Sequence, residues 1–241
     1  WANKAIKEAK IFGNVEVIAS SKSTNYNFIP KNYPIPSDAS YFHITSNNTI
    51  YGTEYHQWPE CDIPLICDMS SDIFSKPIDG NKFGLIYAGA QKNMGPAGTT
   101  LVVVKKELLG KVNRTLPSML DYRIHIENSS MYNTPPVFPI YVSMLTMEWI
   151  KANGGPEQME VRNKKKAALL YNEIDQNPMF TGTVVSEDRS MMNVCFLLKN
   201  SDLDKEFLAE TKKAGIDGIK GHRLVGGFRA SIYNAMPISS V

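Results

Sequence analysis

Residues 85–92 have the sequence LIYAGAQK, in which an apolar run leads directly into a lysine. Residues 65–68, LICD, form a similar run that ends in an aspartate. Short runs of unbroken apolarity are typical of strands that are covered on both faces in an α/β sheet. Ligands bind beyond the carboxyl ends of the strands in open sheets of this kind. We therefore predict an α/β fold in which Asp68 and Lys92 lie close enough to share one ligand.

The same patterns predict further elements along the chain. Helices are expected over residues 2–12, 140–149 and 203–214, and a charged helix is expected to begin at residue 156. Strands are expected over residues 15–19, 41–45, 64–68, 83–88, 99–104, 193–198 and 229–233, and near residues 183 and 219. We predict a large α/β domain over residues 1–152 and a small C-terminal α+β domain over residues 153–241.

The composition excludes several classes of protein. Of the 241 residues, 43% are hydrophobic and 21% are charged, which suits a packed core and not a disordered chain. A formal net charge of +2 gives no reason to expect a nucleic-acid partner, and no apolar run is long enough to cross a membrane. Cys61, Cys67 and Cys195 show no CxxC spacing. We therefore expect neither a disulfide framework nor a metal site, and we expect a cytoplasmic protein.

Lys92 has small neighbours in the sequence. Gly89 and Ala90 precede it, and the GPAG sequence of residues 95–98 follows it, so a backbone or a planar ring can come close. A surface ion pair with Asp68 is the plain alternative, but a solvated lysine does not need such neighbours. Crowding and partial burial would lower the pKa of the amine and favour imine formation with an aldehyde such as pyridoxal phosphate. Asp68 would then pair with the ring nitrogen of that cofactor.

A second cluster of polar residues lies near the end of the chain. Residues 221–231, GHRLVGGFRAS, contain two arginines, one histidine and three glycines. Arginine binds carboxylate or phosphate through two parallel hydrogen bonds, so this segment is a candidate anion site. A basic hairpin on a solvated face is the alternative. Asn133 and Thr134 form a turn before a helix, where helix capping and phosphate binding are both open interpretations.

The chain closely resembles the phosphoserine aminotransferases, a family of class-V aminotransferases that depend on pyridoxal phosphate. The similarity extends over the whole chain, and the matching segments occur in family order at family-like spacing. They are WA (1–2), AIKEAK (5–10), CDMSS (67–71), SKPID (75–79), AGAQKNMGPAG (88–98), YNTPP (132–136) and GHRLVGGFRASIYNA (221–235).

The resemblance implies how the cofactor is held. Lys92 would be the Schiff-base lysine and would also move the proton between the substrate α-carbon and the cofactor. Asp68 would pair with the pyridinium nitrogen, and Trp1 would stack on the ring. Thr49 would hydrogen-bond the ring oxygen, and Gln91 would contact the cofactor phosphate.

The resemblance also implies a substrate pocket and a partner. Arg229 would hold the substrate α-carboxylate, and His222 and Arg223 would lie in the pocket for the substrate phosphate. The family residues that match Asn133 and Thr134 reach the cofactor phosphate of the neighbouring subunit. A homodimer with shared active sites is therefore expected.

The implied reaction interconverts O-phospho-L-serine plus 2-oxoglutarate with 3-phosphohydroxypyruvate plus L-glutamate, by a ping-pong cycle in serine biosynthesis. Bacterial members often also process a phosphorylated hydroxythreonine on the route to pyridoxine. The implied fold is a large aspartate-aminotransferase-like domain with a mixed sheet and a small C-terminal domain. Relative to the family, the segment before Trp1 and the last helix after Val241 are missing. We therefore expect these 241 residues alone to bind the cofactor weakly and to transaminate poorly.

Two other functions compete with this interpretation. One is another class-V enzyme, of the serine–pyruvate aminotransferase or cysteine desulfurase type. A desulfurase needs a cysteine on a loop, whereas Cys67 and Cys195 occupy predicted strands and Cys61 precedes one. The other is a truncated, non-catalytic partner that keeps the fold and the dimer surface.

Overall fold

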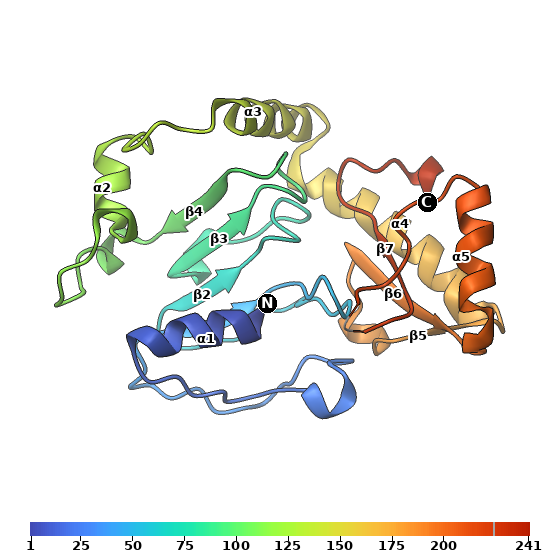
Figure 1. Cartoon of the computed structure of the whole chain (residues 1–241). Helices are drawn as coiled ribbons and strands as arrows, with labels where there is room; N and C mark the ends of the chain where they lie inside the picture. The colour runs from blue at the N-terminus through green and yellow to red at the C-terminus, as the bar shows by residue number, and fades with distance from the viewer. Residues whose placement is uncertain (224) are drawn as a thin grey trace.

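The computed structural model of the protein describes residues 1–223 and 225–241. Its strands form two sheets that lie side by side (Figure 1). The strands of the first sheet are, in spatial order, β1 (Phe42–Thr45), β2 (Leu65–Asp68), β3 (Leu85–Gly89) and β4 (Thr100–Val104). The first three are parallel and β4 is antiparallel to β3, so the sheet is mixed. The four predicted strands are thereby confirmed, with bounds shifted by one or two residues at most.

Alternate side chains of this sheet face a buried core. Leu65 and Cys67 of β2 and Ile86 of β3 are buried there, whereas Asp68 is only partly covered. Because successive side chains of a strand point to opposite faces, Asp68 lies on the face away from this core. The prediction that the strands are covered on both faces is wrong for β4, where Val103 is 51% exposed. The reason is that β4 lies at the edge of the sheet.

The first helix matches its prediction, and the strand predicted after it does not exist. Helix α1 (Ala2–Phe12) ends at Gly13, where the backbone is extended. Residues 15–19 form no strand, and Val17 is exposed. An extended segment becomes a strand only when a neighbour pairs with its backbone, and no strand in the described part of the chain lies beside this one.

The second sheet is antiparallel and carries helices on one side (Figure 1). Its strands are, in spatial order, β5 (Phe180–Gly182), β6 (Asn193–Leu198) and β7 (Phe228–Ser231). Helices α4 (Gly155–Gln176) and α5 (Asp204–Lys213) follow the predicted positions. The strand predicted near Ile219 is reduced to a single bridge between Lys220 and Phe228. Phe196 stacks on Phe228 with ring centroids 5.4 Å apart, and Phe207 packs edge-on against both.

Helices α2 (Tyr122–Glu127) and α3 (Val137–Ala152) lie in the chain between the first sheet and α4. The short helix α2 has no counterpart among the predicted elements, whereas α3 contains the predicted helix at 140–149. Gly154, with φ of 91°, makes the turn into α4, and the predicted domain boundary at 152/153 falls at this turn. That boundary stays a prediction. Within residues 1–223 and 225–241, no helix combines the length and apolarity needed to cross a membrane.

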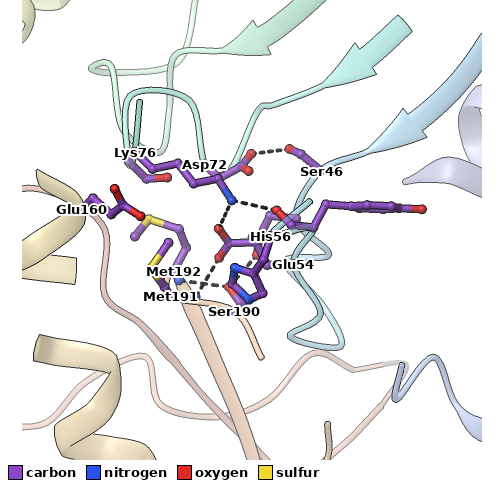
Figure 2. Close-up of polar contacts among 12 residues, drawn as sticks. Ser46, Glu54, His56, Asp72, Lys76, Glu160, Ser190, Met191 and Met192 are labelled. Atoms are coloured by element: carbon purple, nitrogen blue, oxygen red, sulfur yellow. Dashed lines mark hydrogen bonds and ion pairs between the residues drawn. The ribbon is translucent and has the colours of Figure 1, made fainter. Parts of the chain in front are cut away.

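An ion pair with a fully buried carboxylate joins the two sheets (Figure 2). Glu54, which is 0% exposed, accepts a hydrogen bond from Lys76 Nζ at 2.7 Å through Oε1. Its other oxygen, Oε2, accepts from the backbone N–H of Met191 at 2.7 Å, just before β6. Lys76 Nζ also donates to the Tyr55 carbonyl at 2.7 Å. Both charges are therefore satisfied by partners fixed on different parts of the fold.

A second carboxyl group shares this buried region. Asp72 accepts a hydrogen bond from the Ser46 hydroxyl (Figure 2). The pKa of Asp72 is raised to about 7, first by burial and then by the charge of Glu54, while Lys76 opposes the rise. One lysine thus faces two carboxyl groups. Below a pH of about 7, Asp72 holds a proton, which removes negative charge from a buried region.

Neutral side chains extend this network. Asn47 Nδ2 donates to Ser71 Oγ and to Asn193 Oδ1, both at 2.8 Å, and so links the ends of β1 and β2 to β6. Asn193 Nδ2 in turn donates to Ser231 Oγ at 3.2 Å, at the end of β7. Asn47 and Asn193 are almost completely buried. Each hydrogen bond here is made without competition from water, so the network fixes one placement of the two sheets.

Replacing Lys76 by methionine tests the buried ion pair. Lys76→Met leaves the Glu54 carboxylate buried without its counter-charge, so we expect the free energy of unfolding to fall by about 3–5 kcal/mol. Urea denaturation followed by circular dichroism measures this change. The control is Lys164→Met, which removes an exposed ion pair with Glu160 on α4 and should leave stability near the wild-type value. Equal unfolding midpoints for the two variants would contradict the assignment.

Candidate active site

Lys92 lies in a tight turn directly after β3. The Ala90 carbonyl accepts hydrogen bonds from the backbone N–H groups of Met94 at 3.0 Å and Gly95 at 2.9 Å, which fixes the turn. The Lys92 amine donates to Thr49 Oγ1 at 2.6 Å. Thr49 is buried and belongs to the turn that follows β1. The turns that follow β1 and β3, the two strands on either side of β2, therefore hold the lysine in one orientation.

Burial and nearby charged side chains set the pKa of the Lys92 amine. Burial lowers the pKa of Lys92, the carboxylate of Asp68 opposes this decrease, and the guanidinium of Arg229 adds to it. A lysine with a lowered pKa has more of its amine in the free, nucleophilic form near neutral pH. The prediction that Asp68 and Lys92 share one site is consistent with this arrangement, since Asp68 is the charge that acts most on Lys92.

Asp68 ends β2, and Trp1 lies near it. Asp68 Oδ1 accepts a hydrogen bond from the Ser70 backbone N–H at 2.9 Å. The backbone nitrogen of Trp1 is close enough to Asp68 and Lys92 for both charges to act on it. The Trp1 side chain is 60% exposed, with the Lys4 amine 4.5 Å from its ring centroid. Trp1 is thus beside the Asp68–Lys92 pair with a ring that is largely uncovered.

Arg229 reaches the same place from β7 of the second sheet. Its Nη1 donates to the Thr49 carbonyl at 3.1 Å, so Thr49 contacts both Arg229 and Lys92. Its Nε is buried and has no hydrogen-bond acceptor within residues 1–223 and 225–241. A buried guanidinium N–H without an acceptor is unfavourable, and a carboxylate is its natural complement. This geometry fits an anionic ligand beside Lys92.

Other predicted site residues are not brought to Lys92 by any contact within the described chain. Gln91 is exposed, and its side chain lies over the backbone of Gly89. Asn133 and Thr134 are exposed in the segment between α2 and α3, on the β4 side of the sheet (Figure 1). These three residues stay predictions.

The loop before β7 holds the remaining two predicted residues. His222 is half-buried, and its carbonyl accepts hydrogen bonds from Val225 at 2.8 Å and Gly226 at 2.9 Å. Arg223 is exposed. Leu224, which was part of the predicted anion-binding segment, lies outside the described residues. Arg229, at the far end of this segment, contacts Thr49.

The small residues after Lys92 let helix α3 approach closely. A Cβ atom on Gly95 would lie 3.0 Å from Ser143 Oγ, and one on Gly98 would lie 2.9 Å from Pro139 Cγ, both in α3. Close approach of another part of the chain, which the small residues predicted, is therefore present at these two glycines. They let the turn that carries Lys92 pack directly on α3.

Several residues near the site were not predicted from the sequence. His43 of β1 and Tyr87 of β3 lie in contact, with Nε2 of the histidine 3.0 Å from the tyrosine hydroxyl. Asp72 lies behind Asp68, and its charge acts on Lys92. The period-two pattern of the strands could have placed His43 and Tyr87 on the face of Asp68, but only once the strand register was known.

The residues present fit an aldehyde cofactor with a basic ring nitrogen. Lys92 offers an amine whose pKa is lowered by burial, Thr49 a hydroxyl within hydrogen-bond reach of it, and Asp68 a carboxylate whose charge acts on the amine. Arg229 adds an unpaired donor for an acid group. In the part of the chain that the structure describes, no three histidine, cysteine, aspartate or glutamate residues gather in a way that could hold a metal ion.

Comparison with known sequences gives a consistent result. The family model described as Aminotransferase class-V matches residues 1–241. The chain is 64% identical over 241 residues to the phosphoserine aminotransferase of Flavobacterium johnsoniae, covering 100% of this chain and 68% of that protein. It is 58% identical over 243 residues to the phosphoserine aminotransferase of Azobacteroides pseudotrichonymphae, with the same coverage.

Solved structures agree with the sequences. The phosphoserine aminotransferase of Bacillus circulans subsp. alkalophilus superposes with a TM-score of 0.96 at 48% identity, over 100% of this chain and 68% of that one. A phosphoserine aminotransferase from Trichomonas vaginalis, described with bound PLP, superposes with a TM-score of 0.94 at 39% identity, over 100% of this chain and 70% of that one. A further phosphoserine aminotransferase structure, described for radiation damage of its Schiff base, gives 0.96 at 49% identity over 100% and 68%.

The charges around Lys92 can be tested by titration. We expect Arg229→Gln to raise the pKa of Lys92, because it removes a nearby positive charge, and Asp68→Asn to lower it, because it removes a negative one. NMR of the protein after ¹³C reductive methylation of its lysines measures both changes. Lys31, which pairs with Glu187 on the surface, should titrate identically in all three proteins. Shifts of Lys92 in the same direction in both variants would overturn this account of the site.

Proposed function

The chain belongs to the class-V aminotransferase family, and we propose that it acts as the phosphoserine aminotransferase of serine biosynthesis. The reaction moves an amino group between O-phospho-L-serine and 2-oxoglutarate, with 3-phosphohydroxypyruvate and L-glutamate on the other side. The observation that carries this proposal is the amine of Lys92, which shares Thr49 with Arg229 and whose pKa responds to the charges of Asp68 and Arg229.

Pyridoxal phosphate is the cofactor, and when bound it supplies a ring that withdraws electrons from the substrate α-carbon. In our proposal Lys92 holds the cofactor through its amine and moves the proton at the α-carbon. Asp68 keeps the ring nitrogen protonated, and the Thr49 hydroxyl binds the ring oxygen. Trp1 covers one face of the ring, for which its exposed side chain is available. Gln91 contacts the cofactor phosphate.

The substrate is proposed to bind through its two acidic groups. Arg229 takes the α-carboxylate, which supplies the acceptor that its buried Nε lacks. His222 and Arg223 take the phosphate of phosphoserine or the distal carboxylate of 2-oxoglutarate. An amino acid without a second acidic group offers nothing for these residues to bind, so phosphoserine is favoured over alanine.

The three cysteine thiols do not support the sulfur chemistry of a desulfurase. Cys67 in β2 and Cys195 in β6 are buried and free. Burial raises the pKa of Cys67 well above its ordinary value and that of Cys195 to about 12. Burial also raises the pKa of Cys61, whose Sγ donates to the Ile63 carbonyl. A sulfur-accepting cysteine needs an accessible thiolate, which none of the three provides. Free cysteines also support our proposal of a cytoplasmic protein.

A homodimer is proposed as the working unit, with a second copy of this chain covering the α3 face. Val137 is 69% exposed and Phe138 is 68% exposed at the start of α3. Exposed apolar area of this kind is typical of an interface between subunits. Asn133 and Thr134 directly precede these residues and are themselves exposed. They are therefore available to a site in a partner subunit.

Cofactor capture tests the proposed function. Borohydride reduction of the protein with bound pyridoxal phosphate should attach the cofactor to Lys92, as read by peptide mass spectrometry. The comparison residue is Lys166, whose pKa burial lowers to about 8 but whose amine donates to the Ile232 and Tyr233 carbonyls. Glutamate formation from phosphoserine should exceed that from alanine, and Lys92→Ala should lower it by about 10³-fold. Attachment at Lys166 instead of Lys92 would refute the assignment.

Mixing two variants tests the shared site. If Asn133 and Thr134 serve the partner's site, a heterodimer of Lys92→Ala with the Asn133→Ala/Thr134→Ala double variant contains one intact site and one doubly damaged site. Equal mixing should then restore about one quarter of the wild-type activity, since half of the dimers are mixed and half of their sites are intact. If these residues serve their own subunit, every site carries a lesion and mixing restores nothing.

A further inference from the structure

Three polar side chains from neighbouring strands share the face of the first sheet that bears Asp68. Asp68 of β2 is paired with Tyr87 of β3. On its other side Asp68 is paired with Thr45 of β1, and His43 lies two residues before Thr45. Paired residues in adjacent strands point to the same face, as do residues two apart in one strand. His43, Asp68 and Tyr87 are therefore on one face, opposite the core that contains Cys67.

The contacts connect these three side chains in a row. His43 Nε2 is 3.0 Å from the Tyr87 hydroxyl oxygen. Burial raises the pKa of Tyr87, and the Asp68 carboxylate raises it further by its charge and as a hydrogen-bond acceptor. A phenol has one proton, and a carboxylate is the stronger acceptor for it. We therefore assign the phenol proton to Asp68, the residue paired with Tyr87 in the adjacent strand, and the role of acceptor from His43 Nε2 to the phenol oxygen.

The protonation of His43 is consistent with this direction. Burial lowers the pKa of His43, and the charge of Asp68 only partly opposes this decrease. A neutral histidine carries one ring proton, and the contact with Tyr87 places that proton on Nε2. The row thus runs from the neutral imidazole through the phenol to the carboxylate, with each donor matched to one acceptor.

We propose that Tyr87, oriented by His43, is a positioning residue that fixes the plane of the Asp68 carboxylate at the proposed cofactor site. This rests on the proposed function of Asp68 as the partner of the ring nitrogen. The Ser70 N–H holds Oδ1 at 2.9 Å, but one anchor leaves a carboxylate free to rotate about its Cβ–Cγ bond. A second donor stops this rotation, so that a carboxylate oxygen stays aligned with a ring nitrogen.

The test compares two cofactors in the same variant. Pyridoxal phosphate carries the ring nitrogen, and its 1-deaza analogue has a C–H group in that position. We expect Tyr87→Phe to weaken the binding of pyridoxal phosphate about tenfold, because a charge-assisted hydrogen bond at Asp68 is lost. Binding of the deaza analogue should not change. His43→Leu should produce the same pattern with a smaller change, and His43→Asn, which keeps an N–H donor, should restore part of the affinity.

A matched control removes another phenol hydroxyl. Tyr171 is also buried, and its hydroxyl donates to the Ser190 carbonyl at 3.0 Å, away from Asp68. Tyr171→Phe should leave the affinity for both cofactors unchanged. Fluorescence titration of the cofactor-free protein measures all affinities, so no step of the test depends on catalytic turnover.

The outcomes separate this proposal from the proposed function. If the wild-type protein binds pyridoxal phosphate through Lys92 and Tyr87→Phe weakens both cofactors equally, Tyr87 has only a structural role and the positioning proposal fails alone. Unchanged affinity in Tyr87→Phe also overturns it alone. If the wild-type protein does not bind pyridoxal phosphate, both proposals fail.

Discussion

The hydrogen bonds of the Glu54 carboxylate join the part of the chain that carries Lys92 to the part that carries Arg229. One oxygen accepts from Lys76, which follows β2, and the other accepts from Met191, which leads into β6. Arg229 lies on β7, which pairs with β6. A displacement of the second sheet would therefore move the guanidinium away from the lysine. The candidate site exists as a unit because a charge with 0% exposure can be satisfied in only one arrangement of the sheets.

The contact region between the sheets is polar, and this limits how far the two sheets can slide relative to one another. Apolar surfaces tolerate small sliding movements, since dispersion contacts have little directionality. Hydrogen bonds such as those from Asn47 to Ser71 and Asn193 do not, because each donor must stay within reach of its own acceptor. Asn47 lies two residues before Thr49, which contacts both Lys92 and Arg229. The network therefore fixes the site through the residue that joins its two cations.

The sequence predicted those parts of the site that depend on strand direction alone. Asp68 and Lys92 follow apolar runs, and the ends of parallel neighbours meet at one edge, so their proximity could be inferred without coordinates. Tyr87 was missed because its contact with His43 depends on the register of three strands, which the apolar runs do not determine. Residues 15–19 were predicted wrongly because apolarity alone does not supply the neighbouring strand that pairing requires.

The balance of charge at Lys92 links ligand binding to the basicity of the amine. Arg229 lowers the pKa of Lys92 by repulsion, and its Nε lacks an acceptor within the described chain. A carboxylate that pairs with Arg229 cancels part of that repulsion, so the pKa of a free Lys92 amine rises when an acidic ligand binds. Asp68 acts on Lys92 with the opposite sign and is held by the sheet itself, so its effect is constant. The lysine is thus a weaker base before an acid group arrives and a stronger base afterwards, which is the order that the proposed role of Lys92 in proton removal requires.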